Sequence, residues 1–308
     1  MNNNLTVVVP AFNDAAGLEV WLPRLLTVAQ RHGWRVIVVD DGSTDDTPSV
    51  LQAFGDRIQI IRHEVNSGYG AALKSGMLAA GTPWVASMDA DGQHRLEDLE
   101  AMAGCLDSSV DALIGARTRE SHTPLARRPG KWILRQVANI LSGVKIPDIN
   151  CGLRIFRRDI IIQFFSVTSD RFSFSTSCLV ALSQCRCRIR YIPVTIERRI
   201  GKSAVKQARD GLYTCALILR LIFLFKPARI LLPIGFGVFL CAACLLFVHI
   251  VFIRMSTMTV IAWVSGLFIL LISLLADQVS GIRRDFFMRA IRETHERNQD
   301  EAQTAKQE

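Results

Sequence analysis

Short apolar runs alternate with amphipathic segments through the first two thirds of the chain. The runs at 5–10 and 84–88 predict buried strands, and those at 36–39 and 58–61 predict two more strands. Further strands are expected after a polar turn at 148–152 and at 189–196. Residues 17–31 have the apolar spacing of a helix, and small residues at 66–74 open another helix. This alternation predicts an α/β domain with a mostly parallel, Rossmann-like sheet and helices on both faces.

The composition changes after residue 205. Basic residues lie among aliphatic ones at 206–228, which predicts an amphipathic helix at a membrane interface. The apolar segments 230–253 and 257–276 are each long enough to cross roughly 30 Å of hydrocarbon. The alternative is a helical hairpin buried in a soluble core, but the apolar lengths and basic flanks favour membrane spans. We therefore divide the chain into an α/β domain (1–205), an interfacial helix (206–228), a two-span hairpin (229–279) and a basic tail (280–308), with disorder expected from about residue 293.

The formal net charge of +8 is unevenly distributed. Basic residues crowd before the first span and after the second, whereas the connection carries only Arg254. The positive-inside rule then predicts a multi-pass protein of the inner or cell membrane, with the α/β domain and the C-terminus both cytoplasmic. Aromatic and basic residues are not interleaved as in a nucleic-acid groove, which argues against nucleic acid as a partner.

The eight cysteines form no pairs with the spacing of a zinc site. The N-terminus lacks the basic start and uninterrupted apolar run of a secretory signal. We therefore expect the thiols to face the reducing cytosol.

The strongest chemical signal is the sequence D-A-D-G-Q-H at 89–94, directly after a predicted strand. Ligands in open α/β sheets bind beyond the carboxyl ends of strands. Two carboxylates one residue apart, Asp89 and Asp91, are therefore predicted to hold a divalent cation such as Mg²⁺, which takes one or two carboxylates and fills its shell with water and phosphate. The competing interpretation is an acidic turn that caps the next helix. His94 either supports this centre or has a capping or packing role.

Two other segments resemble nucleotide-binding loops without completing them. The G-Y-G at 68–70 begins G-x-G-x-x-G, but Leu73 stands at the third glycine. The G-K-S at 201–203 lacks the leading glycine of a phosphate loop, because Ile196 stands there. These departures argue against a Rossmann dehydrogenase and against a P-loop NTPase.

A basic stretch occupies residues 117–135, with Trp132 and Leu134 among its arginines and lysine. One interpretation is a solvated basic helix. The other is a surface for a substrate that is both anionic and greasy. Basic residues near an anionic membrane surface are each worth about 1 kcal/mol, so such a surface would help to hold a lipid-linked phosphate.

Four motifs together resemble the family 2 glycosyltransferases of the GT-A fold. They are V-V-V-P-A-F-N-D at 7–14, V-D-D-G-S-T-D at 39–45, N-S-G-Y-G-A-A at 66–72 and M-D-A-D-G-Q-H at 88–94. Later motifs narrow the resemblance: G-A-R at 115–117, D-x-x-x-G-L-R at 148–154 and R-x-x-G-x-S at 198–203. With the predicted hairpin, these resemble the polyprenyl-phosphate glycosyltransferases, the group of dolichyl-phosphate mannose synthase and the bacterial GtrB-like enzymes.

The resemblance implies a role for each matching position. Residues expected to bind the nucleotide sugar are Pro10, Phe12, Asp14, Val39, Asp41 and Ala90. Residues expected to hold Mg²⁺ or Mn²⁺ and the diphosphate are Asp89, Asp91 and Gln93. Residues expected to meet phosphates of the donor or of the lipid acceptor are Arg117, Arg127, Lys131, Arg198 and Ser203.

The implied reaction is transfer of a hexose from a UDP- or GDP-sugar to polyprenyl phosphate, with Asp91, Arg117 and Asp148 expected to act in catalysis. The metal neutralises the leaving diphosphate. Because the acceptor phosphate is already anionic, it needs no strong base; Asp148 is the best candidate for a residual base or a positioning group, and a turn-capping aspartate is the alternative. By analogy the reaction inverts the anomeric centre in one displacement.

Two other functions remain open at this stage. One is a glycosyltransferase with another lipid or glycan acceptor, although two spans are few for a processive synthase. The other is a catalytically silent membrane scaffold that binds nucleotide sugars, against which the intact acidic motif argues. The lipid bilayer is an expected partner in each case, and a homo-oligomer is compatible with all three.

Overall fold

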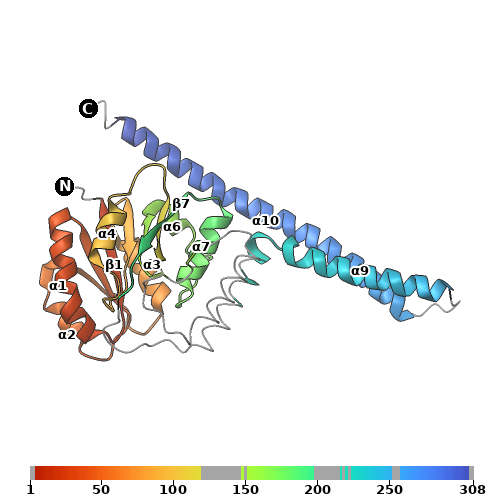
Figure 1. Ribbon diagram of the computed structural model, residues 1–308, viewed down its shortest axis with the longest axis horizontal. Coiled ribbons are helices and arrows are strands. Elements are labelled where there is room, and N and C mark those ends of the chain that lie inside the picture. Colours follow the sequence, from red (N-terminus) through yellow and green to blue (C-terminus); the bar gives the residue numbers. More distant parts are fainter. Residues whose placement is uncertain are drawn as a thin grey trace.

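The computed structural model describes residues 4–118, 147–148, 151–197, 216, 219–220, 223–251 and 257–304. An α/β domain lies beside a long hairpin of two helices, and the second of these helices runs back across the domain (Figure 1). Most of the predicted interfacial helix lies outside the described residues.

A seven-stranded sheet forms the centre of the domain. Its strands are β1 (Leu5–Ala11), β2 (Arg35–Asp40), β3 (Gln59–Arg62), β4 (Trp84–Ser87), β5 (Ala112–Arg117), β6 (Arg154–Arg157) and β7 (Ile189–Val194). They are arranged in the order β3-β2-β1-β4-β6-β5-β7. The predicted mostly parallel sheet is confirmed, since only β6 runs antiparallel to its neighbours. β6 is reversed because the chain leaves β5 at one edge of the sheet and re-enters from that same edge.

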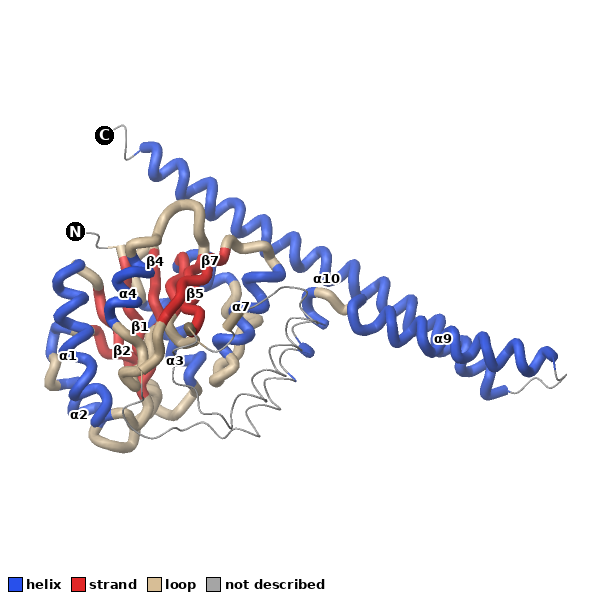
Figure 2. The backbone as a smooth tube through the Cα atoms, viewed as in Figure 1, coloured by secondary structure: helices blue, strands red, loops and turns tan. Residues whose placement is uncertain are grey.

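Helices cover both faces of the sheet (Figure 2). They are α1 (Ala15–His32), α2 (Thr47–Gln52), α3 (Tyr69–Ala79), α4 (Leu96–Ala103), α6 (Arg158–Gln163) and α7 (Phe174–Gln184). Alternate strand residues face opposite sides: Val7 and Val9 pack with α1, α2 and α4, whereas Val8 packs with α3, α6 and α7. The uninterrupted apolar runs of β1, β2 and β4 therefore reflect strands that are buried on both faces, whereas the outer strand β3 is largely exposed.

The hairpin consists of α9 (Ala228–Val251) and α10 (Thr257–Thr304). Only 11% and 17% of their most apolar stretches are buried, and Phe247 and Leu275 are each 68% exposed. A hairpin in a soluble core would bury these side chains, so that alternative is not supported. The helices pack closely at Gly266, where an added Cβ would lie 2.9 Å from the backbone nitrogen of Phe239. Length, composition and small-residue packing all suit helices in a membrane.

The C-terminal segment differs from our expectation of disorder. α10 continues as one helix of 48 residues as far as Thr304. Ser280, Phe287, Ile291 and Thr294 are buried at helical spacing along one side of α10, and Phe287 and Ile291 belong to the core that also contains α6. The charged residues between these positions obscured the pattern, and packing on the domain supplies the order that composition alone did not indicate.

Candidate active site

The loops that follow β1 and β2 are fastened together at the carboxyl edge of the sheet. Asn13, with a φ of 52°, accepts hydrogen bonds through its side-chain oxygen from the backbone nitrogens of Thr44 (2.8 Å) and Asp45 (3.3 Å). Its own backbone N–H donates to the hydroxyl of Ser43, at 3.0 Å. The backbone N–H of Asp14 donates to the hydroxyl of Thr47, at 3.1 Å. These hydrogen bonds fix the two loops relative to each other, next to the residues predicted to bind the nucleotide.

The predicted nucleotide residues occupy different depths at this edge. The side chain of Phe12 is 37% exposed, whereas Pro10 and Val39 are buried within their strands. Ala90 is also buried, and an added Cβ at Gly17 of α1 would lie 3.2 Å from the carbonyl oxygen of Ala90. The side chain of Phe12 is thus the most accessible of these, and the nucleotide contacts of the set remain predictions.

Asp41 is buried and binds the start of α3. Its Oδ1 accepts hydrogen bonds from the backbone N–H of Ser67 (2.9 Å) and lies 2.7 Å from Nδ1 of His63, while its Oδ2 accepts from the N–H of Gly68 (2.8 Å). The far nitrogen of His63 lies 2.9 Å from the hydroxyl of Ser75 within α3. A carboxylate is well suited to the N-terminus of a helix, where backbone N–H groups lack partners. The predicted binding of the nucleotide sugar by Asp41 stays a prediction, and the role of Asp41 at the start of α3 is an addition to it.

Asp89 is held by residues from three separate parts of the chain. The hydroxyl of Tyr69, at the start of α3, donates to Oδ1 of Asp89 at 2.8 Å. The Nε2 of His94 lies 3.6 Å from Oδ2. Gly152 packs directly on the carboxylate: an added Cβ there would lie 2.2 Å from Oδ2. These contacts hold the carboxylate of Asp89 in place, and 31% of its side chain remains exposed to solvent.

The protonation states around Asp89 suit a cation site. Burial raises the pKa of Asp89. The hydrogen bonds from His94 and Tyr69 and the charge of Arg117 lower this pKa by more than burial raises it, so the net pKa lies below the usual carboxyl value. Burial and the adjacent Asp89 hold the pKa of Tyr69 well above its usual value, so its hydroxyl stays protonated and can donate. Asp89 is therefore ionised at neutral pH.

Asp91 and Gln93 complete the turn. The buried Asp91 accepts a hydrogen bond from the backbone N–H of Gln93 at 3.1 Å, within the turn itself. The next helix, α4, begins after Arg95 and has no side-chain capping hydrogen bond, so the helix-capping alternative is not supported. The side-chain nitrogen of Gln93 donates to the carbonyl oxygen of Glu197 (3.1 Å), and the backbone N–H of Glu197 donates to the carbonyl oxygen of Gln93 (2.9 Å). His94 pairs with Ile196 in an isolated bridge. The acidic turn is thus joined to the segment that immediately precedes Arg198.

The donor set fits a hard divalent cation. Asp89, Asp91 and Gln93 offer carboxylate and amide oxygens, which are the ligands that Mg²⁺ prefers. Because Gly152 has no side chain, the carboxylate of Asp89 occupies the space that a Cβ at this position would fill. Within the described ranges, no group of three or more His, Cys, Asp or Glu side chains is arranged to hold a metal. Such a set would leave coordination positions for water and a substrate phosphate.

Arg117 and Asp148 form an ion pair at the carboxyl end of β5. The Nε of Arg117 lies 3.1 Å from Oδ2 of Asp148, and the backbone N–H of Arg117 donates to the same oxygen at 3.3 Å. Asp148 is only 16% exposed in this position. The arrangement favours a carboxylate that positions the guanidinium over one that removes a proton. The adjacent Cys151 is inert as a nucleophile, because burial, followed by the charge of Asp148, raises the pKa of its thiol to about 12.

Other predicted residues lie outside the described part of the chain. They are Arg127, Lys131, Arg198 and Ser203. The structure adds Tyr69, Gly152 and the fully buried Arg154, whose Nε donates to the carbonyl oxygen of Cys151 at 2.8 Å. Tyr69 lies in the N-S-G-Y-G-A-A motif, and Gly152 and Arg154 lie in the D-x-x-x-G-L-R motif, so the motifs marked the segments without indicating these contacts.

Comparison with known proteins identifies the family. The profile described as glycosyl transferase family 2 matches residues 6–165, which include all but the first residue of β1, the strands β2 to β6 and the acidic turn. The chain belongs to glycosyl transferase family 2. A second profile, the GtrB C-terminal hairpin, matches residues 226–282 of this family 2 glycosyltransferase. The resemblance inferred from the motifs is therefore confirmed.

Named relatives of this glycosyltransferase act on polyprenyl phosphates. The polyprenol monophosphomannose synthase of Mycolicibacterium smegmatis is 29% identical over 227 residues, covering 68% of this chain and 84% of that protein. The dodecaprenyl-phosphate galacturonate synthase of Rhizobium johnstonii is 31% identical over 166 residues, covering 52% and 49%. Homologues of this chain thus transfer sugars to polyprenyl phosphates.

Solved structures confirm the GT-A-like fold. The glucosyl-3-phosphoglycerate synthase of Mycobacterium tuberculosis, crystallised with Mn²⁺, UDP and phosphoglyceric acid, aligns with a TM-score of 0.58 and 16% sequence identity. The alignment covers 71% of this chain and 78% of that one. At this level of identity the comparison shows the fold of the α/β domain, while the chemistry rests on this chain's own residues.

Proposed function

We propose that this glycosyltransferase moves a hexose from a UDP- or GDP-sugar to a polyprenyl phosphate at the cytoplasmic face of a membrane. The observation that carries the proposal is the supported, partly exposed Asp89 beside Arg117, in a chain that also has two long, exposed apolar helices. The names of the two relatives support the acceptor class. The basic residues that flank the hairpin support the cytoplasmic orientation.

Asp89, Asp91 and Gln93 would hold Mg²⁺ or Mn²⁺ in this proposal. When bound, the cation acts as a Lewis acid that neutralises the leaving diphosphate. The M. tuberculosis synthase of the same fold was crystallised with Mn²⁺ and UDP. In this chain the carboxylate of Asp89 is oriented in advance by Tyr69 and by the flat surface of Gly152, so little rearrangement is needed when donor and cation arrive.

Arg117 adds a fixed positive charge near Asp89. Its guanidinium is anchored by Asp148, and its field reaches Asp89. A charge that is already oriented stabilises the developing diphosphate without reorganising during the reaction. Asp148 acts here as the positioning group for Arg117.

The reaction is a single displacement. An oxygen of the polyprenyl phosphate forms a bond to the anomeric carbon of the hexose as the bond from that carbon to the diphosphate breaks. The electron pair of the broken bond leaves with the nucleoside diphosphate, and attack from the opposite face inverts the anomeric centre. Because the acceptor oxygen is anionic at neutral pH, no side chain has to remove a proton.

The test is a transfer assay with the purified protein in lipid nanodiscs. Radiolabelled UDP- and GDP-hexoses are screened with Mg²⁺ or Mn²⁺ and a polyprenyl phosphate. We expect one donor to give label that extracts into organic solvent and that mild acid releases as the free sugar. Label found only on a diacylglycerol lipid or on a polysaccharide would replace the acceptor assignment. Tight donor binding without any transfer would indicate a scaffold instead of an enzyme.

A further inference from the structure

Beyond its apolar stretch, α10 packs on the α/β domain through aromatic and aliphatic side chains. Phe287 stacks on Phe164, next to α6, with ring centroids 5.1 Å apart and planes at 11°. The ring of Phe225, which precedes α9, lies 6.1 Å from that of Phe287. Phe225 and Phe287 are buried together with Ile291 in the core that contains α3, α6 and α7. The contact is therefore continuous with the interior of the domain.

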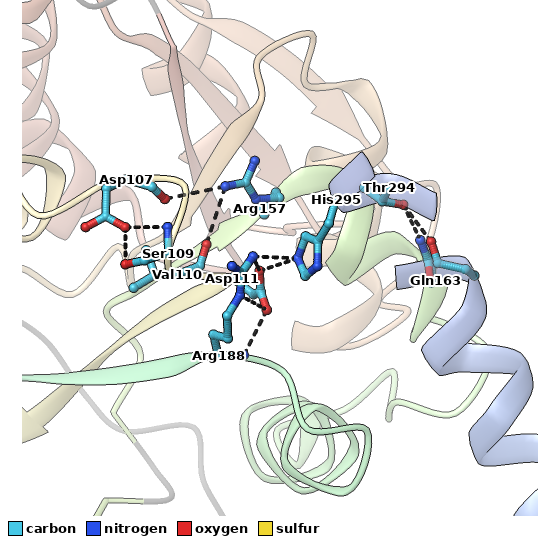
Figure 3. Close-up of polar contacts among 10 residues, drawn as sticks. Asp107, Ser109, Val110, Asp111, Arg157, Gln163, Arg188, Thr294 and His295 are labelled. Carbon is cyan, nitrogen blue, oxygen red and sulfur yellow. Dashed lines mark hydrogen bonds and ion pairs between the residues drawn. The ribbon is translucent and has the colours of Figure 1, made fainter. Parts of the chain in front are cut away.

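Polar contacts extend this packing toward the C-terminus (Figure 3). Nε2 of His295 lies 2.7 Å from Oδ1 of Asp111 and 2.7 Å from a guanidinium nitrogen of Arg188. The carboxylate of Asp111 is completely buried and also accepts the backbone N–H of Arg188, at 2.8 Å. His295 of α10 thus adds a third member to the Asp111–Arg188 pair of the α/β domain.

Two further pairs flank this group. The side-chain nitrogen of Gln163, at the end of α6, donates to the hydroxyl of Thr294 at 3.1 Å. Arg297 pairs with Asp159 of α6 at 2.9 Å. We call Phe287, Ile291, Thr294, His295 and Arg297 the α10 brace. It joins α10 to two parts of the domain, α6 and the start of β5 and β7.

The brace meets the domain at the edge of the sheet away from the candidate active site. Asp111 directly precedes β5, whereas Arg117 of the site is the last residue of the same strand. At about 3.3 Å per residue, a strand of this length separates the two edges by roughly 20 Å. Along α10, residues 276 and 294 are about 27 Å apart at 1.5 Å per residue. One unbroken helix therefore links the apolar hairpin to the far edge of the domain.

We propose that the α10 brace fixes the height and orientation of the active-site edge above the bilayer, so that Phe287, Thr294 and His295 are positioning residues for transfer to a membrane-held acceptor. A linker that allowed free rotation would present the site to the lipid phosphate only part of the time. The hairpin family profile ends at residue 282, so the brace lies in a region that neither family profile matches. The proposal rests on the proposed function, since it needs an acceptor anchored in the membrane.

The test compares one substitution at two histidine–carboxylate pairs. His295→Glu puts a second carboxylate against Asp111 and leaves the Asp111–Arg188 pair in the domain. His32→Glu is the matched control, because His32 lies 2.6 Å from Glu100 in a pair between α1 and α4 that does not involve α10. Both variants and the wild type are studied as full chains in nanodiscs.

Two measurements are made on each protein. Hydrogen exchange read by mass spectrometry follows the amides of α10 from 285 to 297. Transfer rates are measured with a long-chain polyprenyl phosphate in the bilayer and with a short, water-soluble prenyl phosphate. We expect His295→Glu to lose protection in α10. We also expect it to raise KM for the bilayer acceptor about tenfold, because a site that faces the acceptor for about a tenth of the time has its apparent affinity reduced by that fraction. Its kinetics with the soluble acceptor, and all results for His32→Glu, should stay within about twofold of wild type.

Equal losses with both acceptors would mean that the brace only stabilises the fold, and an unchanged KM despite lost protection would overturn its positioning role. Arg297→Glu, which reverses an exposed charge opposite Asp159, provides a second variant if His295→Glu does not fold; it should change KM in the same direction by a smaller factor. If the wild type transfers to neither acceptor, the proposed function fails and the positioning role with it, while the exchange data would still show whether the brace forms.

Discussion

The side chains around Asp89 show how a single carboxylate is prepared for binding. Tyr69 comes from the start of α3, His94 from the turn itself and Gly152 from the segment that enters β6. The sequence predicted Asp89 and Asp91 because two acidic residues follow a strand. It did not indicate Tyr69 or Gly152 as partners, because only the folded chain brings these distant segments to one carboxylate.

Replacing Gly152 by alanine should disturb this arrangement selectively. The added Cβ would lie 2.2 Å from Oδ2 of Asp89, so the carboxylate must move. We expect affinity for Mn²⁺ in the presence of donor, measured by electron paramagnetic resonance, to fall about tenfold or more, which is the scale for disturbing the support of a metal ligand. Gly104→Ala is the matched control, since a Cβ there meets no atom within 3.4 Å. Equal affinities in the two variants would contradict the role of Gly152.

Asp41 shows at the same scale what a motif leaves out. Its binding of the nucleotide sugar stays a prediction, and the structure adds that both of its carboxylate oxygens accept hydrogen bonds from the segment that opens α3. A sequence indicates that a loop is acidic, but the direction in which a carboxylate turns depends on which backbone N–H groups the fold brings near. For Asp41 those groups belong to a segment 26 and 27 residues further along the chain.

At the scale of elements, periodicity located the buried strands and missed features set by tertiary contacts. Residues 36–39 lie within β2, and 17–31 lie within α1. The antiparallel direction of β6 depends on where the chain re-enters the sheet, which apolar spacing does not encode. Helix α10 extends past residue 293 because it packs on the domain, whereas its charged composition alone is typical of a disordered tail.

The junction of α10 with β5 and β7 should depend on pH through Asp111. Burial raises the pKa of Asp111, but the hydrogen bonds from Arg188 and His295 lower it by more, so its net pKa lies below the usual value for an aspartate. A lowered pKa contributes stability above the unfolded-state value, and that contribution is lost as pH falls through the folded-state value. We expect Asp111→Asn to lower the free energy of unfolding by about 1–3 kcal/mol at pH 7. The loss is limited because the unpaired Arg188 can reach solvent.

Thermal unfolding in detergent across a pH series measures this effect. The difference in Tm between wild type and Asp111→Asn should be full at neutral pH and shrink below about pH 4. Asp107→Asn, at an exposed pair with Arg190 on the same edge, should change Tm much less. A difference that stayed constant down to the lowest pH would contradict a contribution from the ionised form of Asp111.

At the scale of the whole molecule, the helix α10 connects the apolar hairpin to the α/β domain. One end of α10 packs along α9 in the exposed apolar stretch, and the other packs on α6 and β5 (Figure 1). A metal-dependent transferase built this way would have its soluble donor and its lipid acceptor meet at a fixed distance from the bilayer.

The orientation in the membrane can be tested with two cysteines, each introduced alone into a variant whose eight native cysteines are replaced by serine. Met258, at the start of α10, is 75% exposed, and Glu296 is exposed near its other end. A membrane-impermeant maleimide added to right-side-out vesicles should label Met258→Cys and leave Glu296→Cys unlabelled, and inside-out vesicles should reverse the result. Labelling of both cysteines from the same side would contradict a two-span hairpin with a cytoplasmic domain.

The most direct test of the account is the rate of sugar transfer to polyprenyl phosphate by Asp91→Asn, compared with Asp107→Asn. The first removes one charge from the buried acidic turn, and the second removes one from an exposed surface pair. With both proteins folded and inserted to the same extent, we predict that Asp91→Asn loses at least about a hundredfold in rate, the scale for losing a group that stabilises transition-state charge, while Asp107→Asn retains wild-type activity. Wild-type transfer by Asp91→Asn would contradict the assignment of the reaction to this turn.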